Sequence, residues 1–318
     1  MFAVAGESLV DLVVQPDGRY AAVPGGAPFN FACALALQGV PAAYLNPLSD
    51  DPFGALLRDT LIRSGVHAPG PQVKAPTSLA VVTTDAQGRP GYGFYRSGVA
   101  DRAIAPETLV DLLPDDARGV HTGGLALVPP DDAGLRELLR TAGARGLVRT
   151  LDVNARPAVT ASLGIAPEAY RRAVLDTAAL ADVVKVSDED LLHLGFAGDP
   201  LVAAASFLER GATLVVLTLG DQGAVALTRR GMIRQRALCV PVVDAVGAGD
   251  CFFAGLVACL LRKDGMPDVL RGDGPGALGP ALRHATACAA ISLQRRGCQP
   301  ATWDEASALA GTLAELDG

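Results

Sequence analysis

A run of small residues between two aspartates is the part of the chain best suited to chemistry. It extends from Asp244 to Asp250, reads Asp-Ala-Val-Gly-Ala-Gly-Asp and precedes a long apolar stretch. Small side chains allow backbone N–H groups to converge on one point, and a helix starting near Asp250 would add its N-terminal partial positive charge. The run is therefore suited to binding an anion. A carboxylate at the mouth of that site could also take a proton from an attacking hydroxyl.

Two other glycine turns resemble ligand contacts in their pattern. Gly25 and Gly26 precede a predicted helix that carries Asn30 on its first turn, and the stretch from Thr218 to Gly223 follows an apolar run. Each could be an ordinary turn, just as Asp250 could be only a helix N-cap. Together, however, they fit a nucleotide phosphate held near a hydroxyl acceptor.

The elements that must position these residues alternate between strand and helix. Apolar strands without polar alternation, separated by amphipathic helices, predict an α/β fold with a mostly parallel central sheet covered by helices on both faces. Strands are predicted at 2–5, 119–123, 148–153, 183–186, 214–219 and 224–227, and helices at 131–144, 168–179 and 200–210. Polar clusters follow three of the strands, where ligands bind in such sheets: 152–156, 187–190 and 220–223.

A small additional sheet is predicted in the first third of the chain. Strands at 78–84 and 91–96, joined by a turn at 86–88, could pair with the segment from Leu12 to Val23. We expect a single domain over 1–318, with a lid formed by about 12–24 and 77–100. Residues 262–279 are rich in Gly, Pro and Asp and predict a flexible loop.

Composition excludes several classes of protein. The 318 residues include 50% hydrophobic residues, enough for a large core, and the net charge of −7 without a Lys/Arg run argues against nucleic-acid binding. No apolar run is long enough to predict a membrane helix, and the N-terminus has no secretory pattern, so a cytoplasmic protein is expected. The six cysteines contain no C-x-x-C pair and predict buried, reduced thiols. Neither G-x-x-x-x-G-K-[ST] nor a G-x-G-x-x-G after a strand is present, which disfavours a P-loop NTPase and a dinucleotide oxidoreductase.

The run from Asp244 to Asp250 resembles the C-terminal signature of the ribokinase-like (PfkB) carbohydrate kinases, D-T-x-G-A-G-D. The Gly25-Gly26 turn with Asn30 is similar to the N-terminal glycine motif of that family, and the remaining clusters follow in the same order along nearly the whole chain. The resemblance implies a ribokinase-like fold. It also implies an ATP-dependent sugar kinase that binds a small-molecule sugar, ATP and magnesium.

The resemblance also implies a role for individual residues. Asp250 would be the general base, and the backbone N–H groups of Gly247, Ala248 and Gly249 would form the anion hole for the transferred phosphoryl group. The expected sugar-binding residues are Asp11, Gly25, Gly26, Asn30, Tyr95, Arg96 and Arg156. The expected ATP-binding residues are Lys185, Ser187, Thr218, Gly220, Gly223 and Thr286.

Two cation sites are implied in the same way. The N-x-x-E motif that supports magnesium through water in the family is replaced here by Ser187 and Asp190, so Asp190 is the expected contact. The same four residues could simply form a helix N-cap with an acidic first turn. A monovalent cation, potassium, is the second expectation, at Asp244, Val246, Ser292 and Gly297.

The sugar is the least determined part of the prediction. Gly6 to Asp11, the Phe94-Tyr95-Arg96 run and the segment from Asp152 to Pro157 resemble the fructokinase branch. Ribokinases favour a Gly-Gly-Lys-Gly start and a carboxylate near the position of Leu125, and this chain has neither. The alternative within the family is 2-keto-3-deoxygluconate kinase, because Arg96 and Arg156 could bind a substrate carboxylate; another sugar or a nucleoside is a further alternative.

A function of another class is a sugar- or nucleotide-binding regulator that has lost catalysis. Such a regulator has no need of Asp250, and the intact small-residue run therefore favours the enzyme. By similarity to dimeric relatives, the lid strands could also pair between two subunits to form a homodimer.

Overall fold

The computed structural model describes residues 1–15, 17–84, 90–263, 266–271 and 278–316. Its central sheet confirms the predicted α/β class. Strands β12, β11, β10, β9, β1 and β4 are parallel neighbours, and β13 and β14 continue the sheet as antiparallel strands beyond β12. The strands are β1 (Phe2–Val4), β4 (Ala42–Tyr44), β9 (Gly119–Gly123), β10 (Val148–Asp152), β11 (Val183–Ser187), β12 (Leu214–Thr218), β13 (Ala224–Thr228) and β14 (Gly231–Gln235).

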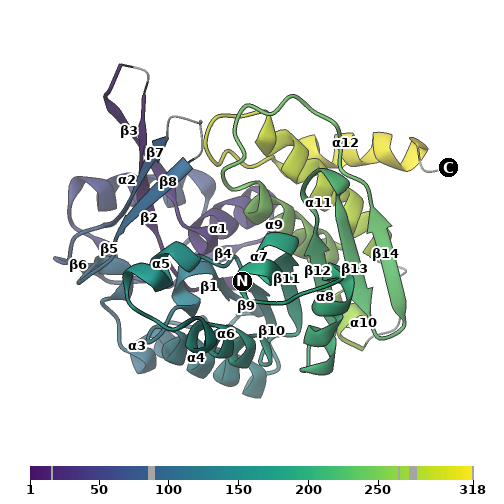
Figure 1. Ribbon diagram of the computed structural model, residues 1–318, viewed down its shortest axis with the longest axis horizontal. Helices are drawn as coiled ribbons and strands as arrows, with labels where there is room; N and C mark the ends of the chain where they lie inside the picture. The colour runs from purple at the N-terminus through teal and green to yellow at the C-terminus, as the bar shows by residue number, and fades with distance from the viewer. Residues whose placement is uncertain (16, 85–89, 264–265, 272–277, 317–318) are drawn as a thin grey trace.

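Helices cover both faces of this sheet (Figure 1). One face packs against α3 (Pro106–Asp111), α4 (Asp132–Ala144), α6 (Pro167–Ala178), α7 (Asp188–His193) and α8 (Pro200–Glu209). The other packs against α1 (Ala27–Leu37), α2 (Pro52–Ser64), α9 (Ala248–Arg262) and α11 (Leu278–Leu293). Side chains alternate along β11, so that Val183 belongs to the α1/α9 side and Val184 to the α4/α6 side.

A separate small sheet has the order β3-β2-β7-β8. It consists of β3 (Tyr20–Gly25), β2 (Leu9–Val14), β7 (Ser78–Thr84) and β8 (Pro90–Tyr95). In Figure 1 it stands at the end of the molecule opposite β13 and β14. Because β3 runs directly into the Gly25-Gly26 turn and α1, this sheet can place its side chains over the ends of the central strands.

The remaining elements are short or peripheral. They are β5 (Leu48–Ser49), β6 (Gln72–Val73), α5 (Pro157–Ser162), α10 (Met266–Arg271), α12 (Trp303–Leu316) and the 3-10 turns η1 (Ala100–Arg102), η2 (Gly124–Leu127) and η3 (Gly220–Gln222). No helix in the described ranges is long and apolar enough to cross a membrane.

Most predicted elements are confirmed to within one or two residues, and three expectations need comment. The loop predicted over 262–279 is wrong for Met266–Arg271, which form α10, because Met266 supplies a buried apolar anchor there. Strand β14 was not predicted. The turn at 86–88 lies outside the described residues. All six cysteines are free, as predicted, and Cys33, Cys251, Cys259 and Cys288 are buried, whereas Cys298 is half-buried and Cys239 exposed.

Candidate active site

Asp250 lies in the first turn of α9, at the carboxyl end of the parallel strands. Its carboxylate accepts a hydrogen bond from the side-chain amide of Asn30, with Oδ2 and Nδ2 2.9 Å apart. Both side chains are buried, and they join helices 220 residues apart in sequence. Burial raises the pKa of Asp250 to about 7, with further upward pressure from the Asp152 carboxylate, while Asn30, Lys185 and Arg156 oppose it. A carboxyl poised near neutrality is suited to general-base chemistry.

The small-residue run forms the N-terminus of α9. Gly247 is its N-cap, in the left-handed conformation with φ 74°, and supplies no side-chain acceptor for the first-turn N–H groups. An added Cβ at Gly247 would come within 2.4 Å of Cys298 Sγ. The run is fixed from both sides by Asp244, whose carboxylate accepts from the N–H of Val246 (3.0 Å) and of Gly297 (2.8 Å). The result is a cradle of backbone donors that fits a phosphate group.

Lys185 lies beneath this cradle. Its ammonium donates to both oxygens of Asp152, at 2.9 and 2.8 Å, and both side chains are buried. An added Cβ on Gly249 would be 3.2 Å from Lys185 Nζ. The structure therefore places this predicted ATP-binding residue against the anion hole and in an ion pair.

The residues predicted to hold the sugar are partly brought together. Asp11 lies on β2 with its carboxylate against Gly25, where an added Cβ would be 2.4 Å from Oδ2. Burial raises the pKa of Asp11 to about 6, while Arg156 lowers it and Asp244 raises it, which puts all three charges in one neighbourhood. Gly26 has φ 107°, and an added Cβ there would meet the Glu7 carbonyl oxygen at 2.5 Å. Only glycine can occupy that position without displacing the backbone.

The other three residues predicted to bind the sugar, Tyr95, Arg96 and Arg156, differ in how far they are exposed to solvent. Tyr95 is 65% exposed. Arg96 is buried, and its Nη1 donates to Asp101 at 2.9 Å. Arg156 is exposed at the start of α5 and is directed by its hydrogen bond to the Ala155 carbonyl. Of the two predicted arginines, therefore, Arg156 has the accessible guanidinium, whereas that of Arg96 is paired within the protein.

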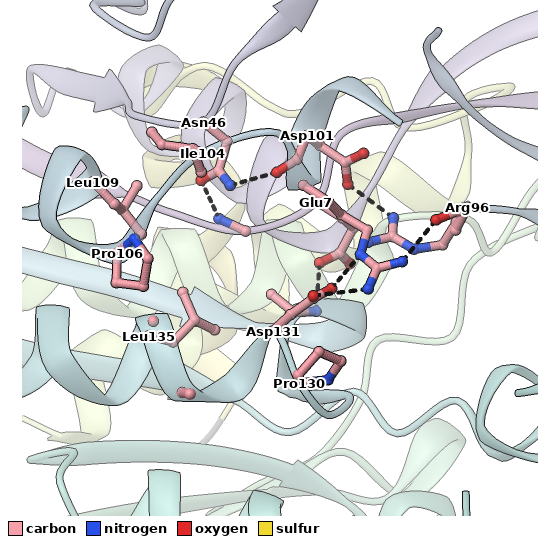
Figure 2. Close-up of a pocket in the computed structure, with 15 residues that line it drawn as sticks. Glu7, Asn46, Arg96, Asp101, Ile104, Pro106, Leu109, Pro130, Asp131 and Leu135 are labelled. Carbon is pink, nitrogen blue, oxygen red and sulfur yellow. Dashed lines mark hydrogen bonds and ion pairs between the residues drawn. The ribbon is translucent and has the colours of Figure 1, made fainter. Parts of the chain in front are cut away.

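A cavity of about 200 Å³ adjoins this region (Figure 2). Arg96, Asp101 and Glu7 lie along one side of it, and the apolar side chains of Leu109 and Leu135 along the other. Neither Asp250 nor Asp11 lines it. The cavity is thus separate from the cradle, and Glu7 connects its wall to the N-terminus of α1.

Glu7 is a residue for which the sequence indicated no role. Its two carboxyl oxygens accept from the N–H of Ala27, at 3.2 Å, and of Ala126, at 3.3 Å. Burial raises its pKa to about 7. By binding Ala27 it anchors the helix that carries Asn30. The signals in the sequence were its position directly after the first strand and its place in the run from Gly6 to Asp11, which resembles the fructokinase branch.

The predicted nucleotide residues lie along the ends of β11 and β12. Ser187 and Thr218 are paired in the parallel register, so they are neighbours at the carboxyl edge. Gly220 and Gly223 both have positive φ, 55° and 92°, and an added Cβ at Gly223 would come within 2.1 Å of Gln235 O. Thr286 is buried on α11, on the α9 side of the sheet. The structure therefore presents Ser187, Thr218 and the glycine turn on one edge.

Both carboxyl oxygens of Asp190 accept hydrogen bonds from backbone N–H groups. It forms a capping box with Ser187, and its Oδ1 accepts from the N–H of Ala155 at 2.6 Å. The capping interpretation of this acidic turn is therefore confirmed. Within the described residues, no group of three or more acidic, His or Cys side chains is arranged to hold a metal. A magnesium ion near Ser187 and Asp190 would therefore be held chiefly by nucleotide phosphates and water, with few protein ligands, which is how magnesium is usually bound.

The residues matching a monovalent-cation loop are close in the structure. Asp244 bridges Val246 and Gly297, and the Asp244 N–H donates to Leu293 O next to Ser292. The Ser292 hydroxyl is fully buried and has no hydrogen-bond partner among the described residues. An unpartnered buried oxygen is costly and fits a cation ligand.

The fold and this site together define a class. A near-neutral carboxyl beside a helix N-terminal phosphate cradle, next to a glycine turn at the same sheet edge, is the arrangement of an enzyme that transfers a phosphoryl group to a hydroxyl. Over residues 3–305 the chain matches the pfkB family of carbohydrate kinases, and it belongs to that family. It is an ATP-dependent sugar kinase.

Individual relatives agree with this assignment. A fructokinase of Rhizobium leguminosarum bv. trifolii is 36% identical over 82% of this chain and 79% of its own length. The crystal structure of a Xylella fastidiosa fructokinase with bound ATP superimposes with a TM-score of 0.87 at 26% identity, covering 99% of this chain and 98% of that one. A Vibrio cholerae O395 fructokinase in a form binding fructose, ADP and a calcium ion gives a TM-score of 0.78 at 25% identity, covering 99% and 97%.

The raised pKa of Asp250 predicts a pH-dependent stability difference. A carboxyl with a pKa near 7 in the folded protein and 3.8 otherwise favours folding when protonated, and this contribution is lost as pH rises through that interval. Asp250→Asn should therefore have nearly the wild-type Tm at pH 4.5 and a Tm several degrees higher at pH 7.5, because about 1.4 kcal/mol corresponds to each pKa unit. Thermal unfolding at both pH values measures it. The exposed Glu168→Gln is the control, and an equal difference at both pH values would contradict the burial effect.

Proposed function

We propose that this kinase transfers the γ-phosphoryl group of ATP to the 6-hydroxyl of fructose, giving fructose 6-phosphate. The observation that carries the proposal is the contact between Asp250 and Asn30 at the N-terminus of α9, with Asp11 and the Gly25-Gly26 turn nearby. Asp11 and the Gly25-Gly26 turn lie in runs that resemble the fructokinase branch, and the similar proteins named above are fructokinases.

In this mechanism Asp250 removes the proton from the sugar hydroxyl as the oxygen attacks phosphorus. Asn30 donates to the Asp250 carboxylate and orients it, and Gly26 and Asp11 bind other sugar hydroxyls. The N–H groups of Gly247, Ala248 and Gly249 receive the negative charge of the transferred group. Closure of the β3-β2-β7-β8 sheet over the sugar would exclude water from the site.

ATP would lie along the edge formed by Ser187, Thr218 and the Gly220–Gly223 turn, with Thr286 toward the adenine. Magnesium, when bound, neutralises the phosphate charge. Potassium would lie at Asp244, Val246, Ser292 and Gly297, and the buried unpartnered Ser292 hydroxyl supports this site. By binding there it would fix the run that begins at Asp244.

The environment of Arg96 disfavours 2-keto-3-deoxygluconate as the substrate. A forked donor for a substrate carboxylate must be free to form two parallel bonds. The Arg96 guanidinium is buried and paired with Asp101, whereas Arg156 alone is accessible. Of the two arginines that could bind a substrate carboxylate, only Arg156 is therefore left as a free donor, so the keto acid loses one of its two expected contacts.

A substrate panel tests the choice of sugar. We expect ADP release with ATP and magnesium to have its highest kcat/KM with fructose, by about tenfold or more over 2-keto-3-deoxygluconate, ribose, tagatose and adenosine. A preference for the keto acid would promote that alternative. Absence of turnover with all five acceptors, while sugar binding persists, would instead support a regulator without catalysis.

A further inference from the structure

A buried ion pair lies under the phosphate cradle and takes no direct part in the mechanism above. Asp152 ends β10 and Lys185 lies near the end of β11, and they are partners in the parallel register. The Lys185 ammonium is 2.9 and 2.8 Å from the two Asp152 oxygens. The two residues are 5% and 2% exposed, so solvent screens the pair little.

The orientation of the pair is set by strand alternation. Val183 packs on the α1/α9 side of the sheet while Val184 and Val186 pack on the other, so Lys185 points toward α9. There its Nζ lies 3.2 Å from the position that a Cβ on Gly249 would take. The pair therefore meets the first turn of α9, one residue from Asp250.

Stability alone does not account for this placement. A helix N-terminus repels cations, and a buried ion pair is often no better than apolar residues of the same volume. An Asn or Met at these positions would fill the space without desolvating two charges. The feature that the charges do affect is the neighbouring carboxyl.

Asp250 is surrounded by charged and polar groups from every element packed against it. Asn30 on α1 donates to it, Asp152 on β10 repels its negative charge, and Lys185 on β11 attracts it. Arg156, at the start of α5, also attracts it. Cys298, in the segment after α11, is also close enough for the Asp250 charge to raise the pKa of its thiol. Among these, Asp152 is the only acidic side chain that raises the pKa of Asp250.

We propose that Asp152 and Lys185 are positioning residues for the phosphoryl transfer, a fixed pair of opposite charges that acts on Asp250 from beneath the first turn of α9. Burial raises the pKa of Asp152, while the Lys185 ammonium lowers it and holds the carboxylate in place. Asp152 in turn makes Asp250 a stronger base. Neither residue needs to touch the sugar. This inference rests on the proposed role of Asp250 as the base.

The pH dependence of kcat/KM tests the pair, because a purely structural contribution would lower activity without moving the profile. In Asp152→Asn the repulsion is lost and Lys185 is unopposed, so the acid limb should move about one pH unit lower. In Asp152→Asn/Lys185→Met both charges are absent. Its limb should lie between those of Asp152→Asn and wild type, because Asp152 acts on Asp250 more strongly than Lys185 does.

Two further readouts keep the test decisive. The double variant has no unpaired buried charge, so it should fold even if Asp152→Asn does not, and a limb at or above the wild-type position would overturn the proposal. The proposal would also be overturned if the KM for ATP of the double variant rose more than about tenfold while the acid limb of its pH profile stayed in place. That result is expected if Lys185 binds ATP directly. Asp250→Asn distinguishes a failure of the base assignment from a failure of the proposed role of the ion pair. If it retains wild-type turnover, the base assignment fails; if it is inactive while the limb of Asp152→Asn stays at the wild-type pH, only the tuning role fails.

Discussion

Replacing Asp250 by asparagine should lower kcat for ADP formation by about 10³-fold, the range expected for removing a general base. The amide has nearly the same shape and can still hydrogen-bond to Asn30, but it cannot accept the proton from the sugar hydroxyl. Initial-rate assays with fructose and saturating Mg-ATP measure the loss.

Binding should be largely preserved in the same variant. Titration calorimetry with fructose in the presence of a non-hydrolysable ATP analogue should give a Kd within a few-fold of the wild-type value, because Asp11, Gly26 and Arg156 are unchanged. Wild-type turnover in Asp250→Asn would eliminate the base role. A complete loss of sugar binding would show instead that Asp250 mainly supports the pocket.

Gly247→Ala should have the second largest effect, a loss of about 10² in kcat, comparable with removal of one oxyanion-hole donor. Gly247 has φ 74°, and an added Cβ would meet Sγ and Cβ of Cys298 at 2.4 and 2.6 Å. Either relaxation, rotation of the Gly247 peptide or displacement of the Cys298 segment, would misdirect the cradle N–H groups. Steady-state kinetics should show the loss in kcat more than in KM for fructose.

Two companion variants separate the causes. Gly247→Ala/Cys298→Gly removes the collision but retains the backbone strain, so it should recover only part of the activity. Gly311→Ala, in α12, is the matched control, because an added Cβ there has no neighbour within 4 Å. Full recovery in the double variant would mean that the left-handed conformation is unimportant for catalysis.

The parts of the fold that depend on local apolar pattern could be predicted from the sequence. Strands such as Phe2–Val4 and Leu214–Thr218 are largely apolar runs, and the structure places them in the parallel part of the sheet. The pairing of β7 with β8 was predicted from two strand-like runs, 78–84 and 91–96, that lie close together in the sequence. Strand β14, in contrast, has one buried residue, Gln235, and an otherwise exposed or half-exposed pattern. Pairing with β13, rather than its own composition, makes it a strand.

The site was predictable to the extent that its residues lie in short motifs. Asp250 and Asn30 meet beside Gly247, and Asp11 lies against Gly25. The partners of buried charges were not predictable, because they depend on register between distant strands. The Arg96–Asp101 pair, the Lys185–Asp152 pair and the anchoring of α1 by Glu7 are all contacts of this kind. They changed the interpretation of one arginine, Arg96, and one lysine, Lys185, which a motif alone would assign directly to ligands.

The product formed from fructose is the most direct test of the proposed reaction. With the wild-type protein, D-fructose and Mg-ATP, ³¹P and ¹³C NMR of the reaction mixture should show ADP and fructose 6-phosphate accumulating in equal amounts. Fructose 1-phosphate would place the wrong hydroxyl beside Asp250. ADP without a phosphorylated sugar, or no reaction, would contradict the proposed transfer to fructose.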